Sequence, residues 1–129
     1  VDSNLTSAYY LLKLLVPHFL KREKGQIVAV SSIAGKTGFA NHTAYCASKF
    51  GLMGLLEALR AEVQGKGITV TAISPGATDT PYWDDVPGDW PREKMMDPST
   101  VADAVLFALN QPAAACIEEL VIQPAGGPL

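Results

Sequence analysis

Three segments with helical spacing of apolar residues alternate with three short apolar runs along this chain of 129 residues. The helical segments lie at 2–23, 43–64 and 98–109, and the runs lie at 26–31, 68–74 and 119–123. The runs are nearly continuous and rich in β-branched residues, which is typical of parallel strands covered on both faces. Alternation of this kind predicts right-handed crossovers and an α/β fold built on a parallel sheet.

Individual residues predict details of the three helices. Pro17 lies inside the first helical segment, where its ring and missing N–H predict a kink or a local break. Gly51 and Gly54 lie inside the second segment and predict close packing of that helix, at some cost in helix propensity. Asp97 is expected to cap the third helix, with Pro98 as its first residue.

Composition and charge exclude several classes of function. The net charge is −3, and no basic face with interleaved aromatic residues is present, so nucleic acid is not an expected partner. Cys46 and Cys116 lie far apart and form no CxxC or Cys/His cluster, which argues against a disulfide framework or a metal site and fits a reducing cytoplasm. No apolar run reaches about 18 residues, so no membrane span is expected.

Tyr45 and Lys49 are four residues apart near the start of the second helical segment. Four residues make about one helical turn, so the phenol and the ammonium are expected on the same face. A cation about 4 Å from a phenolate contributes about 4 kcal/mol at an effective dielectric constant of about 20. That is enough to bring a phenol with a pKa of about 10 toward neutrality. The pattern is short, and an ordinary helical neighbour pair is the alternative.

Three segments that are separate in sequence are expected to converge at one edge of the sheet. Ser31 and Ser32 follow the first strand, and Pro75 with Gly76 follows the second. Tyr45 opens the helix between those two strands. Ligands of open parallel sheets bind beyond the carboxyl ends of the strands, so this edge is the predicted site. Strand alternation does not decide which of the two serines faces the site.

Two segments closely resemble the short-chain dehydrogenase/reductase family: residues 27–35, which read IVAVSSIAG, and residues 45–51, which read YCASKFG. The resemblance implies a Rossmann-like, doubly wound parallel sheet. It also implies an NAD- or NADP-dependent oxidoreductase that interconverts a small alcohol and a carbonyl compound.

The resemblance assigns catalytic roles to four residues. Ser32 takes the place of the serine that polarises the substrate oxygen, and the family spacing favours it over Ser31. Tyr45 takes the place of the general acid/base, and Lys49 that of its activator, with both expected to contact the nicotinamide cofactor. Asn4 resembles the asparagine that holds a water on the proton relay, and the residues themselves equally allow a helix-capping role for it.

The stretch from Pro75 to Thr80, which reads PGATDT, resembles the Pro-Gly turn that cups the nicotinamide ring in the same family. Gly76 lets backbone approach a flat ring closely. The resemblance implies that the backbone of Thr78 and the hydroxyl of Thr80 hold the carboxamide. An ordinary loop after a strand is the alternative interpretation.

A long regular element is excluded in residues 80–97 by Pro81, Pro87 and Pro91 within the segment and by Pro98 directly after it. In the resembling family this position holds a mobile lid over the substrate, and Tyr82, Trp83 and Trp90 are its candidate residues here. A surface loop whose tryptophans fill the core is the alternative. Acidic residues in this segment disfavour a strongly anionic substrate.

The resemblance covers only the second half of the family's fold. A dinucleotide site needs a glycine-rich turn between a strand and a helix, and neither Gly35-x-x-Gly38 nor Gly51-x-x-Gly54 meets that requirement. We therefore expect residues 1–129 to be the C-terminal catalytic half of one Rossmann-like domain, inactive by itself. The strand at 26–31 would then expose an apolar edge, which favours self-association.

Two further expectations concern partners and competing functions. The resemblance implies a homodimer or homotetramer formed through helices 2–23 and 43–64. A non-catalytic assembly or dimerisation module is one alternative function, and an epimerase or dehydratase that uses the same Tyr/Lys pair is another. The sequence does not specify the substrate, nor does it choose between NAD and NADP.

Overall fold

The computed structural model describes the backbone of residues 2–32 and 43–129, and side chains from residue 5 onward within those ranges. The main elements, in chain order, are α1 (Asp2–Arg22), β1 (Gly25–Val30), α2 (Thr43–Val63), β2 (Ile68–Pro75), α3 (Pro98–Leu109) and β3 (Glu119–Ile122). Two short 3₁₀ helices, η2 (Pro81–Asp85) and η3 (Arg92–Lys94), lie between β2 and α3.

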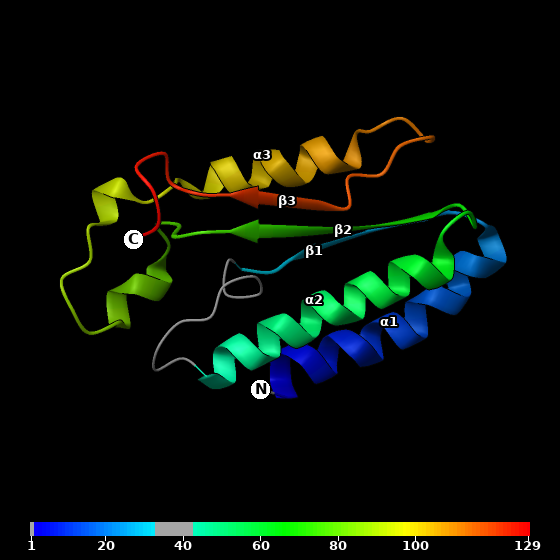
Figure 1. Cartoon of the computed structure of the whole chain (residues 1–129), viewed down its shortest axis with the longest axis horizontal. Coiled ribbons are helices and arrows are strands. Elements are labelled where there is room, and N and C mark those ends of the chain that lie inside the picture. The colour runs from blue at the N-terminus through cyan, green and yellow to red at the C-terminus, as the bar shows by residue number, and fades with distance from the viewer. Residues whose placement is uncertain (1, 33–42) are drawn as a thin grey trace.

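The three strands form one parallel sheet in the order β1-β2-β3. Helices α1 and α2 cover one face of this sheet and α3 covers the other (Figure 1). The fold is therefore α/β and Rossmann-like, as the alternation of apolar patterns predicts, with three strands and three main helices.

The central strand β2 contributes side chains to both layers of the core. Val70 and Ala72 pack with residues of α2, including Leu56, whereas Ile73 packs with Ala104 of α3. Val70, Ala72, Ile73 and Leu56 are all completely buried. A strand covered on both faces needs apolar residues at successive positions, which explains its nearly continuous apolar sequence.

The ends of the elements lie within two residues of the predicted positions, and the predicted cap of α3 is confirmed. The Asp97 side chain accepts a hydrogen bond from the Ser99 N–H at 2.9 Å, and Pro98 is the first helical residue. Of the kink or local break predicted at Pro17, the break does not occur, because α1 is continuous through it. Pro17 is exposed, so water can bond the Lys13 carbonyl that lacks a helical partner.

Only one of the two glycines inside α2 serves close packing. A Cβ atom on Gly51 would lie 2.8 Å from a terminal methyl of Leu5, so this glycine allows α1 to approach α2. Among the described residues, a Cβ atom on Gly54 would meet nothing within 4 Å. The prediction of close packing is therefore wrong for Gly54.

Candidate active site

The carboxyl ends of all three strands and the first turn of α2 lie at the same end of the molecule (Figure 1). The segment that joins β2 to α3, with η2 and η3, lies at this end as well. Strand topology thus brings together the candidate residues of β1, α2 and β2 that the sequence separates.

Ser31 and Ser32 differ in accessibility at the end of β1. The Ser31 N–H donates to the Ile73 carbonyl at 2.7 Å, which extends the pairing of β1 with β2 by one residue. Ser31 is only 7% exposed, and its hydroxyl has no hydrogen-bond partner within the described part of the chain. Ser32 is half-buried, so it is the serine with the more accessible side chain.

Tyr45 and Lys49 lie on the same face of α2, as their spacing predicts. The Lys49 Nζ atom lies 5.6 Å from the centroid of the Tyr45 ring, within range of a cation–π interaction. Tyr45 is 45% exposed, whereas Cys46 and Ser48 between them are buried. The buried pair fixes this turn of the helix against the core and leaves the phenol accessible.

Two sequence predictions fall partly or wholly outside the described residues. Asn4 is the third residue of α1, so it does not precede the helix as a capping residue does; its side chain lies outside the described set. The Gly35-x-x-Gly38 stretch falls within residues 33–42, which lie outside it too.

The turn after β2 contacts the end of β3. The Gly76 N–H donates to the Ile122 carbonyl at 2.8 Å. The carboxamide oxygen of Gln123 occupies the place that a Cβ atom on residue 76 would need. Any other residue here would therefore have to displace the Gln123 side chain, a constraint that the sequence does not reveal.

A short parallel bridge between Thr78 and Met96 fixes the backbone beyond this turn. The Met96 N–H donates to the Ala77 carbonyl at 3.0 Å, and the Asp79 N–H donates to the Met96 carbonyl at 2.8 Å. The N–H and the carbonyl of Thr78 itself consequently point away from Met96. The Thr78 carbonyl accepts from Trp83 Nε1 at 2.9 Å, and its hydroxyl donates to the Gly76 carbonyl at 3.0 Å.

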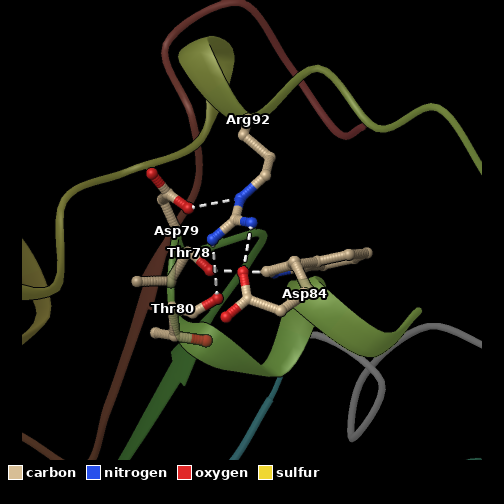
Figure 2. A network of polar contacts seen from close by, with 6 residues as sticks. Thr78, Asp79, Thr80, Asp84 and Arg92 are labelled. Carbon is tan, nitrogen blue, oxygen red and sulfur yellow. Dashed lines mark hydrogen bonds and ion pairs between the residues drawn. The ribbon is translucent and has the colours of Figure 1, made fainter.

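Arg92 connects three points of the same segment (Figure 2). Its Nε donates to Asp79 at 2.8 Å, one terminal nitrogen donates to Asp84 at 2.6 Å, and the other donates to the Thr80 carbonyl at 3.1 Å. Hydrogen bonds to Asp84, and then to Asp79, raise the pKa of the guanidinium above its usual value, so it stays charged. No pattern in the local sequence points to Arg92.

The three aromatic residues predicted to form a lid pack against one another. The ring centroids of Tyr82 and Trp83 are 5.3 Å apart in an edge-on arrangement, and those of Trp83 and Trp90 are 4.9 Å apart. Neither tryptophan belongs to the two buried clusters of the core in the described residues. This arrangement disfavours the alternative in which the tryptophans fill the core.

Two other kinds of feature are absent from the described residues. No group of three or more potential metal ligands gathers in one place among them. No helix in the same ranges combines the length and apolar character that crossing a membrane requires.

Comparison with known proteins decides the family. Residues 1–89 match the family model described as short chain dehydrogenase. The chain belongs to the short-chain dehydrogenase family. An oxidoreductase of Staphylococcus saprophyticus is 33% identical over 124 residues, which cover 96% of this chain and 52% of that protein. A sepiapterin reductase of Chlorobaculum tepidum is 32% identical over 127 residues, which cover 98% of this chain and 52% of the relative.

The fold of this short-chain dehydrogenase chain matches that of a solved structure. The closed form of a serine dehydrogenase complexed with NADP⁺ matches with a TM-score of 0.81 and 26% identity, covering 93% of this chain and 52% of that one. The chain thus spans about half the length of the relatives that it matches.

Proposed function

We propose that the whole protein is an NAD- or NADP-dependent oxidoreductase that interconverts a small alcohol and a carbonyl compound. The observation that carries the proposal is the accessible Tyr45–Lys49 pair at the carboxyl edge of the sheet. Similarity to relatives named as oxidoreductases and reductases supports the same class of activity.

In the proposed mechanism the proton moves at the Tyr45 hydroxyl. Lys49 lies on the same face of α2 as Tyr45 and assists it in giving and taking a proton. Ser32 donates a hydrogen bond to the substrate oxygen, and this bond strengthens as negative charge develops there. Asn4 is proposed to hold a water on the path to Lys49.

The donors at this edge fit a nicotinamide nucleotide. Lys49 offers an ammonium for the ribose hydroxyls, and Thr80 offers a hydroxyl for the carboxamide. The N–H and the carbonyl of Thr78 face away from the Met96 bridge, and Pro75 and Gly76 form the turn beside them. The cofactor, when bound, supplies hydride transfer at the nicotinamide ring.

We propose that the segment with Tyr82, Trp83 and Trp90 closes over the substrate. Clustered, partly exposed aromatic rings on a loop suit transient contact with an apolar substrate body. The exposed carboxylates of Asp85 and Asp89 disfavour a strongly anionic substrate.

We further propose that residues 1–129 are the C-terminal catalytic half of one Rossmann-like domain, with the pyrophosphate-binding turn contributed by preceding sequence. Coverage of 52% of both the Staphylococcus saprophyticus oxidoreductase and the Chlorobaculum tepidum reductase supports this proposal. The cysteines of the described residues, Cys46 and Cys116, are free thiols, which fits the cytoplasm as the location of the protein.

The outer face of α1 supports the proposed dimer or tetramer through α1 and α2. Leu14 is 76% exposed, and Tyr9, Tyr10 and Leu11 are exposed on the same helix. Tyr10, Leu11 and Leu14 share one face by their spacing, and large apolar side chains on an exposed face are typical of an interface. An assembly module without catalytic activity remains the competing function that this face favours.

Cofactor titration of the intact protein separates the two functions. We expect saturable binding of NADH or NADPH, measured by calorimetry, and oxidation of the bound cofactor when a panel of small ketones and aldehydes is added. Binding of neither dinucleotide by the intact, folded protein would contradict the oxidoreductase and favour the assembly module.

A further inference from the structure

Arg92 holds together the two ends of the segment that contains both the proposed carboxamide contacts and the proposed lid. Its three acceptors belong to Asp79, Thr80 and Asp84, which lie 8 to 13 residues away in sequence. Asp79 stands between Thr78 and Thr80, the two residues proposed to hold the nicotinamide carboxamide. The guanidinium therefore restrains the backbone on which both contacts depend.

The lid is joined to the same stretch of backbone by a second contact. Trp83 Nε1 donates to the Thr78 carbonyl, and the Trp83 N–H donates to the Thr80 carbonyl at 3.1 Å. Arg92 also bonds Asp84, the neighbour of Trp83 (Figure 2). Movement of the aromatic cluster thus requires movement of the carboxamide contacts unless these bonds break.

The arrangement requires an arginine at residue 92. Three acceptors in different directions match the planar fork of a guanidinium, and the single ammonium of a lysine cannot reach all three in that geometry. Without the cation, the carboxylates of Asp79 and Asp84 would repel each other, and the Thr80 carbonyl would keep only the Trp83 N–H as a donor.

We propose that Arg92 is a positioning residue, which sets Thr78 and Thr80 for the nicotinamide carboxamide and couples the lid to that site. The inference rests on the proposed function, because it assumes a nicotinamide cofactor at this edge. Arg92 acts here through Thr78, Thr80 and Trp83 and does not touch the reacting atoms.

The test compares two ligands in the intact protein by calorimetry. NADH or NADPH, whichever the wild-type protein binds, contains the nicotinamide, whereas ADP-ribose or its 2′-phosphate does not. We expect Arg92→Met to weaken the dinucleotide about tenfold, the loss of roughly one hydrogen bond to the carboxamide, and to leave the ADP-ribose ligand unchanged. Asp84→Asn should act in the same direction with a smaller effect.

Matched controls lie next to the tested residues. Lys94→Met removes a cation from the 3₁₀ helix that contains Arg92, and Asp85→Asn removes a carboxylate next to Asp84. Both side chains are exposed. We expect both variants to bind the dinucleotide and the ADP-ribose ligand like the wild type. Equal weakening of both ligands by Arg92→Met would indicate general damage and overturn the inference.

Tryptophan fluorescence supplies a readout that needs no cofactor. The chain has two tryptophans, Trp83 and Trp90, and both lie in the aromatic cluster. We expect Arg92→Met to shift their emission, and about 1 M KCl to shift the wild type in the same direction, because exposed ion pairs are screened by salt.

The outcomes are distinct. An unshifted emission, or dinucleotide affinity unchanged in the variant, overturns the inference while the proposed function stands. A wild-type protein that binds neither nicotinamide dinucleotide overturns the proposed function and, with it, this inference.

Discussion

At the scale of single residues, the side chain of Gln123 explains why residue 76 is glycine. Its carboxamide lies where a Cβ atom would be, and the φ angle of Gly76 is not among the positive ones. Space and not backbone conformation therefore sets the requirement. The end of β3 thereby shapes the turn that follows β2.

Substitution at residues 76 and 123 should be coupled. We expect Gly76→Ala to lower the free energy of unfolding of the intact protein by about 1–3 kcal/mol through overpacking against Gln123. In a Gln123→Ala background the same change should cost well under half as much, because the space is then free. Urea unfolding of the four proteins of this cycle measures the coupling. Additive effects would show that Gln123 is not the cause.

At the scale of elements, α2 contains two glycines with different consequences. Gly54 has open space where a side chain would lie, whereas Gly51 faces Leu5 of α1. We expect Gly54→Ala to raise the free energy of unfolding by about 1 kcal/mol, since alanine favours the helix and meets no atom. Gly51→Ala, the matched control in the same helix, should gain less because Leu5 must move. Thermal unfolding checks the order, which a larger gain at Gly51 would contradict.

The start of α3 makes one contribution to stability dependent on pH. Hydrogen bonds from the Ser99 hydroxyl, and then from its N–H, lower the pKa of the Asp97 carboxyl in the folded protein. The pKa of Asp97 is therefore lower in the folded protein than in the unfolded chain, where it is about 3.9. The stabilisation by Asp97 is fully present at pH values above the unfolded pKa. It is lost as the pH falls through the folded pKa.

Asp97→Asn should keep a capping side chain but remove this titration. We therefore expect the difference in melting temperature between the wild type and the variant to be constant from neutral pH down to about pH 5 and to shrink below about pH 4. Calorimetry across this range measures it. A difference in melting temperature that grows as the pH falls would contradict a lowered pKa of Asp97 in the folded protein.

At the scale of the whole molecule, two apolar surfaces need partners. In the described residues β1 pairs with β2 on one side only, and Val30 at its end is 50% exposed. The outer face of α1 exposes Leu14 and its neighbours. Both features favour association of the 129-residue chain with other copies of itself.

Leu14→Lys tests the α1 face in the intact protein. We expect this change to lower the oligomeric state measured by sedimentation, because it places a charge in the proposed interface while Leu14 contributes little to the core. Leu106→Lys, at an exposed position of α3 on the opposite layer, should retain association through α1 and α2. Unchanged association in Leu14→Lys would contradict the proposed interface.

The sequence predicts features that depend on local periodicity, and it does so for most of the fold. Helix and strand positions, the Asp97 cap and the shared face of Tyr45 and Lys49 all follow from spacing of a few residues. Arg92 and Gln123 escaped prediction because their partners are brought close only by the tertiary fold. At Pro17 a local pattern misleads instead. Proline usually interrupts a helix, but at this exposed position α1 continues past it.

The central claim is that the proton moves at the Tyr45 hydroxyl, and Tyr45→Phe in the intact protein tests it most directly. The change removes one oxygen from an exposed side chain, so the fold and the dissociation constant of the nicotinamide cofactor should be nearly unchanged. We predict that kcat falls by about 10²–10⁴-fold, the range for loss of a general acid/base. A variant that binds cofactor normally and turns over substrate at the wild-type rate would contradict the account.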